Sequence, residues 1–459
     1  MDKTVIFGPP GTGKTTYLMR LLEDALKSTP ANEIAFVSFT RQGTYEGVKR
    51  AIDQFKLTDS DTRYFKTIHS LCYSALNMHK SMLVGKEHYR LLSEKTGISF
   101  TGYFTEDCTS TNDVYLHILS MRKHNPIYAK IIEREVNANT LKYVDVQYNQ
   151  MKRQLGLLDF DDLLTEYVRV GRPLDAKVVF IDEGQDLTLL QWEVVTKMFS
   201  NAEYIFVAGD DDQAVFEWAG AKVSQFLNFS DRHVLLKKSY RLPSRVLKLA
   251  SKVTKDISRR KAKVFDPKDD EGDISTVSAF GAISYKGGEL VLARTNWILK
   301  QISSEFSHLG IPYTIKGKPS IDPLILRAIK AHIAFEKREV GPETMMKFKP
   351  YFSAIDYRPW QSTIDMPKSV VTHYANYIGV NENLKPVEFE TFHSCKGGEN
   401  DHVILTPILS QKVHSRMFKR TDAELRCLYV ALTRTKHKLT FVLPQSKYYY
   451  PTRYYTERG

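Results

Sequence analysis

The sequence has few cysteines, and they form no recognisable set. Cys72, Cys108, Cys395 and Cys427 are the four cysteines among 459 residues, and no two of them make a C-x-x-C pair. Disulfide frameworks and structural zinc sites both require paired or regularly spaced cysteines, so neither class of protein is expected. We predict four free thiols in a reducing compartment.

Long hydrophobic runs are also missing. No stretch approaches the roughly 18 apolar residues of a membrane-spanning helix. The N-terminus does not resemble a secretory signal, because Val5–Phe7 is a short apolar run that leads directly into a glycine-rich loop. We therefore predict a cytoplasmic protein, in a bacterial cytosol or an infected host cell, with no membrane partner.

Glycine and proline, at 24 and 18 residues, are too few for a collagen-like or disordered chain. The length predicts roughly two to four domains. Positive charge is in excess, with 65 Lys and Arg against 53 Asp and Glu and a net charge of +12. This excess favours a polyanionic partner such as nucleic acid, because basic side chains on phosphates release condensed counterions. Basic proteins without such a partner are also common.

Apolar runs predict the strands. They are Thr4–Phe7, Ile34–Val37, Val178–Ile181 and Tyr204–Ala208. Runs without polar alternation are typical of parallel strands that are covered on both faces. Between the first two runs, apolar residues at helical spacing over 18–26 predict a helix. Strand, helix and strand in this order predict an α/β fold with a parallel sheet and ligands at the carboxyl ends of its strands.

Interruptions of this pattern predict the domains. A second α/β unit is expected to begin near Arg232, with His233–Leu236 as its first strand. The charged run Arg259–Lys263 is interpreted as a solvated surface loop. The complete division is a first domain at 1–76 and 151–231, a helical insertion at 77–150, a second domain at 232–318 and 387–459, and a short insertion at 319–386.

The loop Gly8–Thr15 matches G-x-x-x-x-G-K-[ST] and joins the first strand to the first helix. Its glycines let backbone N–H groups turn toward phosphates without Cβ clashes, and the helix N-terminus adds partial positive charge. Lys14 can reach the β- and γ-phosphates, and the Thr15 hydroxyl can ligate Mg²⁺. The predicted nucleotide-binding residues here are Gly8, Pro10, Gly11, Thr12, Gly13, Lys14, Thr15 and Thr16. The alternative is a glycine-rich turn that binds nothing.

Two carboxylates follow the third apolar run. Asp182 and Glu183 stand where this buried strand ends. Asp182 is predicted to hold Mg²⁺. Glu183 is predicted to polarise the attacking water as a general base. Such a pair is common by itself, and its meaning comes from its combination with the glycine-rich loop.

The string Asp-Glu-Gly-Gln-Asp at 182–186 resembles motif II of superfamily 1 DNA helicases of the UvrD/Rep/PcrA type. Other motifs of that family follow in order along nearly the whole chain. They are Val37–Thr40, similar to motif Ia, Thr67–Leu71 (Ib), Leu157–Leu164 (the stretch before motif II), Gly209–Gln213 with Phe216 and Trp218 (III), Ser239–Arg241 (IV), Thr391–Glu399 (V) and Leu428–Arg434 (VI).

The resemblance implies two RecA-like P-loop domains with inserted helical subdomains, named 1A, 1B, 2A and 2B-like, and with ATP and Mg²⁺ as cofactors. It implies that Gln213 senses the γ-phosphate and that Arg241 and Arg434 stabilise the transition-state charge. Tyr240 would stack on the adenine, and Glu399 would contact the ribose. Without the motif context, each arginine would be interpreted as a surface ion pair and Tyr240 as a core residue.

The resemblance also implies a track for single-stranded DNA. Phe39, Phe216 and Trp218 match aromatic residues on which bases stack, a contact that tolerates any sequence. Thr40, His69 and His393 would touch the backbone of the strand. Core packing is the alternative interpretation of the aromatic residues.

Three positions depart from the family. Met1–Lys3 alone precede the first strand, where the family has a Gln-bearing segment that reads adenine. Thr16 stands where an Arg usually sandwiches the base, and Ala219 stands where an Arg usually follows motif III. The insertion at 319–386 is also short, which suggests a compact phage or viral member.

The expected activity is that of an ATP-hydrolysing DNA helicase or single-strand translocase, moving 3′ to 5′ by resemblance. Its expected partners are single-stranded DNA and tailed duplex DNA, and the chain is expected to act as a monomer. Two alternatives remain: a helicase for RNA or RNA–DNA hybrids, and a nucleotide-gated DNA-binding factor that does not unwind.

Overall fold

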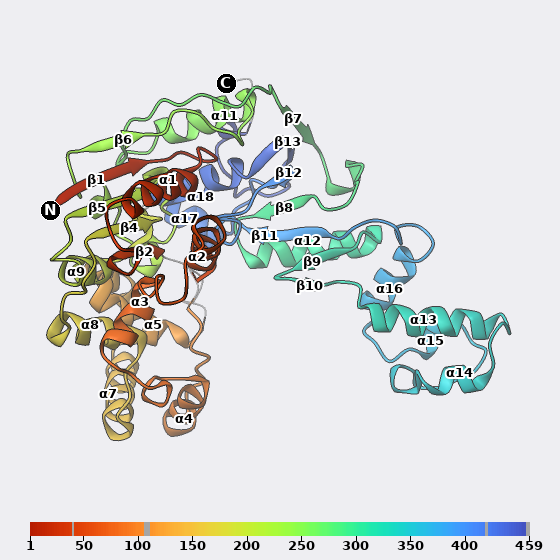
Figure 1. Cartoon of the computed structure of the whole chain (residues 1–459). Coiled ribbons are helices and arrows are strands. Elements are labelled where there is room, and N and C mark those ends of the chain that lie inside the picture. The colour runs from red at the N-terminus through yellow and green to blue at the C-terminus, as the bar shows by residue number, and fades with distance from the viewer. Residues whose placement is uncertain (39–40, 105–110, 418–420, 456–459) are drawn as a thin grey trace. The chain divides into compact units, whose positions relative to one another are not determined.

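The computed structural model describes residues 1–38, 41–104, 111–417 and 421–455, with the backbone alone for 41–46 (Figure 1). The chain divides into two compact units. Unit 1 contains Met1–Tyr240 and Ser258–Asp266, and unit 2 contains Arg241–Ile257 and Pro267–Gly459. Each unit is built around its own sheet. The predicted division into four subdomains within these units stays a prediction.

Unit 1 is built on a six-stranded sheet in the order β3-β2-β4-β5-β1-β6, with every neighbouring pair parallel. Continuous apolar sequence produces this sheet, since every residue of β2 and β4 is buried. The predicted α/β fold with a parallel sheet is confirmed. The strands are β1 (Asp2–Phe7), β2 (Ile34–Ser38), β3 (Phe65–Lys66), β4 (Val178–Asp182), β5 (Tyr204–Gly209) and β6 (His233–Leu235).

Helices cover both faces of this sheet. Alternate side chains along each strand point to opposite faces. Val179 and Ile181 of β4 pack in one core with helices α3, α8 and α9, whereas Val178 and Phe180 pack in the other with α1. The helices are α1 (Lys14–Leu26), α2 (Arg41–Phe55), α3 (Ile68–Ala75), α8 (Phe160–Val170), α9 (Leu189–Met198) and α10 (Val223–Leu227).

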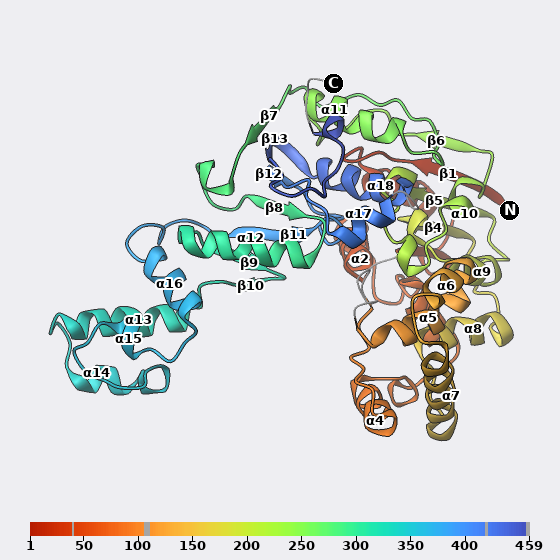
Figure 2. The same cartoon turned by 180° about the vertical axis from the view of Figure 1, so that it is seen from behind.

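A helical region lies between β3 and β4 in the chain. Its helices α4 and α7 lie side by side in both views of the molecule and share a small core that includes Leu92 and Val144 (Figure 1, Figure 2). Helix α7 continues to Leu155, past the predicted end of the insertion at 150. The helices are α4 (Lys86–Thr96), α5 (Asp113–His124), α6 (Pro126–Glu133) and α7 (Ala138–Leu155).

Unit 2 is built on a seven-stranded sheet in the order β10-β9-β11-β8-β12-β13-β7, which is parallel except for the pair β9–β10. Helix α12 (Asn296–Leu309) packs on one face through Ile302 and Phe306. The strands are β7 (Asp273–Val277), β8 (Leu290–Ala293), β9 (Tyr313–Ile315), β10 (Lys318–Pro319), β11 (Val387–Thr391), β12 (Asn400–Leu405) and β13 (Thr435–Val442).

The remaining helices of unit 2 form two groups. Helix α11 packs against α18, and α18 lies on β12 and β13. The stretch 319–386 forms a helical group with its own core around Phe335 and Trp360, and its helix α16 packs against α12 (Figure 1). The helices are α11 (Ser244–Lys255), α13 (Pro323–Glu336), α14 (Pro342–Met346), α15 (Trp360–Thr363), α16 (Lys368–Tyr377), α17 (Gln411–Met417) and α18 (Thr421–Leu432).

Two expectations are wrong. The strand His233–Leu235 does not open the second unit, because it pairs with the outer edge of β1 in the first sheet and gives that edge a partner. The charged run Arg259–Lys263 is not simply a solvated loop. The Lys263 side chain is only 1% exposed, because it is surrounded by aspartates of unit 1.

Cys72, Cys395 and Cys427 are free thiols and are buried, while Cys108 lies outside the described residues. Within the described part of the chain, no helix combines the length and the apolar character that crossing a bilayer requires.

The buried His117 of α5 is expected to make the folded protein less stable in acid. It is 2% exposed, and its ring lies 6.1 Å from that of Trp218. Burial lowers the pKa of His117 to about 4, from an ordinary value near 6.5. The unfolded chain therefore binds a proton between these two values that the folded chain does not bind, and stability is lost as the pH falls through this window.

We expect His117→Gln to reduce the loss of unfolding free energy between pH 7 and pH 4 by up to about 3 kcal/mol. Urea denaturation followed by tryptophan fluorescence measures this loss. The exposed His79 provides the control variant His79→Gln, for which we expect the wild-type pH dependence. An equal acid sensitivity of the wild type and His117→Gln would contradict the assignment.

Candidate functional site

The glycine-rich loop lies between β1 and α1, at the carboxyl edge of the first sheet. Gly11 and Gly13 have φ angles of 71° and 76°, a left-handed conformation that favours glycine. The Thr12 hydroxyl donates to the Pro9 carbonyl at 2.8 Å. The Gly8 N–H donates to the Gly209 carbonyl at 2.9 Å, which fixes the loop to the end of β5. The loop therefore has the compact turn that its sequence predicts.

Lys14 opens helix α1 and turns back over this loop. Its Nζ donates to the Gly8 carbonyl at 3.0 Å and lies 3.8 Å from Glu183 Oε1. A Cβ at position 8 would lie 2.0 Å from Lys14 Cγ, so the lysine side chain packs directly on the glycine. The next residues differ, since Thr15 is half-buried whereas Thr16 is exposed.

Asp182 ends β4 within reach of Thr15. The Thr15 hydroxyl donates to Asp182 Oδ2 at 3.1 Å. Burial and the neighbouring charge of Glu183 raise the pKa of Asp182 to about 6. A hydroxyl and a carboxylate side by side are hard oxygen ligands of the kind that Mg²⁺ prefers. Since Mg²⁺ in nucleotide sites takes few protein ligands, these two residues fit such an ion.

Glu183 is held in an unusual backbone conformation. Its φ of 57° and ψ of 41° are left-handed, which is uncommon for a residue other than glycine. The Glu183 N–H donates to Asp182 Oδ1 at 2.9 Å, and Gln185 Nε2 donates to Glu183 Oε2 at 2.5 Å. The surrounding contacts thus impose the strain and fix the direction of the carboxylate.

A chain of buried hydrogen bonds continues from Glu183 to Gln213. Gln185 donates to Glu183 and accepts the Asp210 N–H through its Oε1 at 3.1 Å. Asp210 Oδ2 in turn accepts from Gln213 Nε2 at 2.7 Å. The ends of β4 and β5 are therefore joined by polar side chains that are at most 5% exposed, except for Glu183. The sequence analysis assigns no role to Gln185 or Asp210. Their position, as polar residues shortly after buried strands, was the signal that could have indicated one.

Two glycines permit this arrangement. A Cβ at Gly184 would lie 2.3 Å from Val207 Cγ1, and a Cβ at Gly209 would lie 2.3 Å from Gln185 Oε1. Both distances are shorter than a real Cβ contact allows. The two strand ends can therefore approach closely enough for Gln185 to join them.

Unit 2 holds most of the remaining predicted nucleotide residues. Arg241 Nε donates to Glu399 Oε2 at 2.7 Å. Arg434 is 1% exposed, and its guanidinium donates to the carbonyls of Val430 at 2.9 Å and Gly398 at 3.1 Å. Motif VI is therefore joined to motif V inside this unit.

Tyr240 is the last residue of unit 1 before the chain enters unit 2. Its side chain is 75% exposed, and its backbone N–H donates to the Gly11 carbonyl at 2.8 Å. The neighbouring Ser239 hydroxyl donates to the Pro10 carbonyl at 2.8 Å. The alternative interpretation of Tyr240 as a core residue is therefore wrong, and its predicted stacking on adenine stays a prediction.

The predicted DNA contacts are placed in part. Phe39 and Thr40 lie outside the described residues. Phe216 and Trp218 are half-buried, with ring centroids 6.5 Å apart. His69 is half-buried against the exposed ring of Phe160, at 5.7 Å between centroids.

His393 belongs to unit 2. Its Nε2 lies 3.4 Å from Cys427 Sγ, and its Nδ1 lies 3.5 Å from Arg294 Nη1. Arg294 also forms a bidentate pair with the buried Glu424, at 2.7 and 2.8 Å. The histidine is thereby attached to a buried charged group between the ends of β8 and β11 and helix α18.

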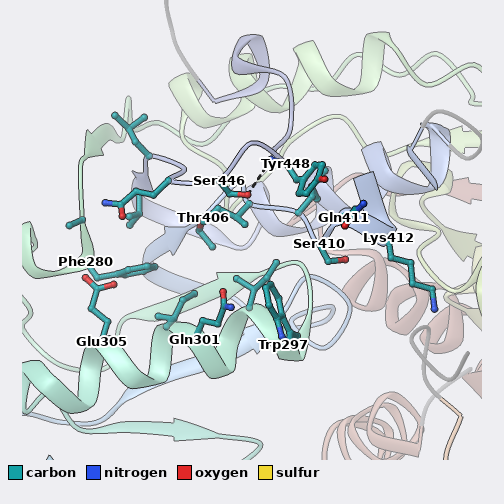
Figure 3. Close-up of a pocket in the computed structure, with 18 of the residues that line it drawn as sticks. Phe280, Trp297, Gln301, Glu305, Thr406, Ser410, Gln411, Lys412, Ser446 and Tyr448 are labelled. Atoms are coloured by element: carbon teal, nitrogen blue, oxygen red, sulfur yellow. Dashed lines mark hydrogen bonds between the residues drawn. The ribbon is translucent and has the colours of Figure 1, made fainter. Parts of the chain in front are cut away.

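Unit 2 also contains a cavity of about 1010 Å³. Its walls come from the segments that follow β7, β12 and β13 and from the first turns of α12 (Figure 3). Phe280, Trp297 and Tyr448 supply aromatic surface, and Lys412 supplies positive charge. The residues that line this cavity do not include any of the predicted nucleotide-binding or catalytic residues.

Comparison with known proteins identifies the family. A model described as the UvrD/REP helicase N-terminal domain matches residues 1–234, which is just over half of the chain. The chain belongs to the UvrD/REP helicase family.

Two relatives are described as ATP-dependent DNA helicase PcrA. The one from Staphylococcus epidermidis is 23% identical over 451 residues, which cover 84% of this chain and 62% of the relative. The one from Staphylococcus aureus is 23% identical over 484 residues, which cover 91% of this chain and 65% of the relative. The chain thus matches less than two thirds of the length of these UvrD/REP relatives.

Solved structures give weaker likenesses. The arterivirus nonstructural protein 10 helicase is 10% identical with a TM-score of 0.39, and the match covers 97% of this chain and 60% of that one. The PRRSV helicase is 10% identical with a TM-score of 0.38, and the match covers 97% of this chain and 53% of that one. The assignment of two sheet-based units therefore rests on the strand pairings described above.

Gly209 provides a test of the junction between β4 and β5. We expect Gly209→Ala to lower the free energy of unfolding by roughly 1–3 kcal/mol, because the added Cβ displaces Gln185 or Phe226. Gly341→Ala is the matched control, since a Cβ there meets nothing within 4 Å and the φ angle is negative. Chemical denaturation of the three proteins measures the difference. Equal stability of the two variants would show that the close approach is relieved without cost.

Proposed function

We propose that this UvrD/REP family member is an ATP-dependent DNA helicase or single-stranded DNA translocase that moves 3′ to 5′. The observation that carries the proposal is the buried hydrogen-bond chain from Glu183 through Gln185 and Asp210 to Gln213. It joins the proposed base to the proposed γ-phosphate sensor at the carboxyl edge of one sheet. Membership of the family supplies the reaction class.

Each residue has a proposed role in hydrolysis. The loop Gly8–Thr15 and Lys14 bind the phosphates, and Thr15 with Asp182 holds Mg²⁺. The ion neutralises phosphate charge when it is bound. Glu183 accepts a proton from the attacking water, and its strained backbone keeps its carboxylate in one direction. Gln213 orients that water or the γ-phosphate through its fixed amide.

Unit 2 is proposed to supply positive charge to the phosphates of the nucleotide. Arg241 and Arg434 are proposed to stabilise the transition state, and Glu399 to contact the ribose, as in the family motifs. Tyr240 is proposed to stack on the base, for which its exposed ring is suited. Thr16 does not provide the second stacking surface that an Arg would give.

The proposed DNA contacts are Phe39, Thr40, His69, Phe216, Trp218 and His393. Phe216 and Trp218 stand three and five residues after Gln213 and are only half-buried. A base that stacks on them is therefore connected by a few residues to the proposed γ-phosphate sensor. This connection is a route by which DNA could stimulate hydrolysis.

Turnover of ATP with and without single-stranded DNA tests the proposal. We expect DNA to raise kcat, and Lys14→Ala to lower it by a factor on the order of 10² to 10³, because a cation at the phosphates is lost. Lys27→Ala is the control, since Lys27 directly follows the last residue of α1 and its side chain is 70% exposed. Circular dichroism should show the same fold for all three proteins. Hydrolysis that DNA leaves unchanged would contradict a DNA motor.

Strand displacement tests direction and substrate. With 3′-tailed and 5′-tailed DNA duplexes, we expect unwinding of the 3′-tailed one, and DNA to compete better than RNA of equal sequence. Trp218→Ala should slow unwinding and weaken binding of single strands by about 1–3 kcal/mol. Tyr204→Ala is the control, because this exposed ring begins β5 at the opposite edge of the sheet. Nucleotide-dependent binding without displacement would favour the DNA-binding factor instead.

A further inference from the structure

Residues Ser258–Asp266 form a segment that returns to unit 1, and we call it the return segment. The chain leaves unit 1 after Tyr240, builds α11 in unit 2, returns for these residues, and then enters unit 2 again. At its end, the Asp266 N–H donates to the Lys237 carbonyl at 2.6 Å, and the Ser239 N–H donates to the Asp266 carbonyl at 2.9 Å. The return segment is therefore a built part of unit 1.

Lys263 is the centre of this segment. Its side chain is 1% exposed, and its ammonium contacts three consecutive aspartates. The distances are 3.0 Å to Asp210 Oδ1 and 2.9 Å to Asp212 Oδ2, and Asp211 Oδ1 is also in direct contact. The ammonium donates a hydrogen bond to Asp211 and forms close ion pairs with Asp210 and Asp212.

The rest of the segment completes the neutralisation. Arg260 forms a bidentate pair with Asp212, at 2.8 and 2.7 Å. The Lys261 N–H donates to Asp211 Oδ2 at 2.7 Å. Three adjacent carboxylates that are at most 1% exposed would repel one another strongly without these partners. The return segment therefore supplies the charge that allows Asp210–Asp212 to be buried.

Asp210 connects this cluster to the proposed catalytic groups. Its Oδ1 faces Lys263, its Oδ2 accepts from Gln213, and its N–H donates to Gln185, which contacts Glu183. Lys263 Nζ also lies 5.9 Å from the ring centroid of Phe7, the last residue of β1 before the phosphate loop. A single ammonium thus contacts the residue that accepts from Gln213 and lies over the ring of the last strand residue before the loop.

We propose that Lys263 is a positioning residue for ATP hydrolysis, which fixes Gln213 and Glu183 through the Asp210 carboxylate. This inference rests on the proposed function. It gives the return segment a role in positioning the proposed catalytic groups. Lys263 touches no substrate, and it acts by fixing the orientation of Asp210. Asp210 Oδ1 is held by the ammonium at 3.0 Å and by the Asp212 N–H at 3.2 Å, and Oδ2 accepts from the Gln213 amide. Loss of the ammonium removes the closer and charged contact of Oδ1, so the carboxylate holds the Gln213 amide less firmly.

A purely stabilising role is the alternative. Removing one partner of a buried ion pair leaves uncompensated charge, which destabilises a fold without any effect specific to catalysis. The two roles are separated by a variant that restores the charge balance but not the contact with Asp210. Lys263→Met combined with Asp211→Asn removes one positive and one negative charge, and the Asn carbonyl can still accept the Lys261 N–H.

The experiment measures kcat, KM for ATP and melting temperature for the wild type, Lys263→Met, Asp211→Asn and the double variant. We expect Lys263→Met to melt lower than the wild type and the double variant to recover most of that loss. For Lys263→Met and for the double variant, we expect kcat to be on the order of 10-fold to 100-fold below that of the wild type, with KM for ATP nearly unchanged. Asp211→Asn and the exposed control Lys261→Met should keep the wild-type kcat.

A second readout does not depend on turnover. Hydrogen exchange of the backbone amides in 209–216 should be faster in the double variant than in the wild type, and unchanged in Lys261→Met. A double variant that regains both its melting temperature and its kcat, or whose amides in 209–216 exchange as in the wild type, overturns the positioning role. If the wild type does not hydrolyse ATP, the proposed function fails, and the exchange measurement alone decides whether Lys263 orders these residues.

Discussion

The structure of the site depends on one constraint, which is that the polar groups buried where β4 and β5 end must satisfy one another. Gln185 meets it by donating to Glu183 and accepting from Asp210, and Asp210 then holds Gln213. Buried polar groups in a low dielectric are costly when unpaired and strong when paired, so a complete network of this kind fixes its members in one arrangement. The parallel sheet makes the network possible, since its carboxyl ends bring residues from distant parts of the sequence to one edge.

The same edge contains features that oppose stability. Glu183 has a left-handed backbone, and burial beside Glu183 raises the pKa of Asp182. Both features cost free energy in the folded protein, and they leave the Glu183 carboxylate oriented and the Asp182 carboxylate poorly solvated. The apolar cores on the two faces of the first sheet offset this cost. This distribution is what is expected of a site that binds a cation, because the positive charge would relieve the repulsion between the two acids.

The sequence predicted what depends on local pattern. The runs Val178–Ile181 and Tyr204–Ala208 are strands because continuous apolar residues suit a sheet covered on both faces, and the loop Gly8–Thr15 follows its strand as predicted. Contacts between segments that are distant in the sequence were not predictable. Charge patterning interprets Arg259–Lys263 as solvated, since nothing near it in sequence shows that three aspartates some fifty positions earlier will surround Lys263. The expectation that His233–Leu236 opens the second unit is wrong for the same reason, because the partner of the strand His233–Leu235 is the distant N-terminal strand.

In unit 2, hydrogen bonds join motifs IV, V and VI to one another. Arg434 of motif VI donates to the carbonyl of Gly398 in motif V, and Arg241 of motif IV is paired with Glu399, the next residue. Arg241 also reaches the Thr433 carbonyl at 3.4 Å, beside Arg434. Three segments that are far apart in sequence thus hold each other through the guanidinium groups proposed to serve hydrolysis. Since Arg434 is almost completely buried, turning its side chain alone would break several hydrogen bonds without a replacement. These arginines therefore belong to one hydrogen-bonded group of unit 2, and their proposed contribution to catalysis is that of the group rather than of either side chain alone.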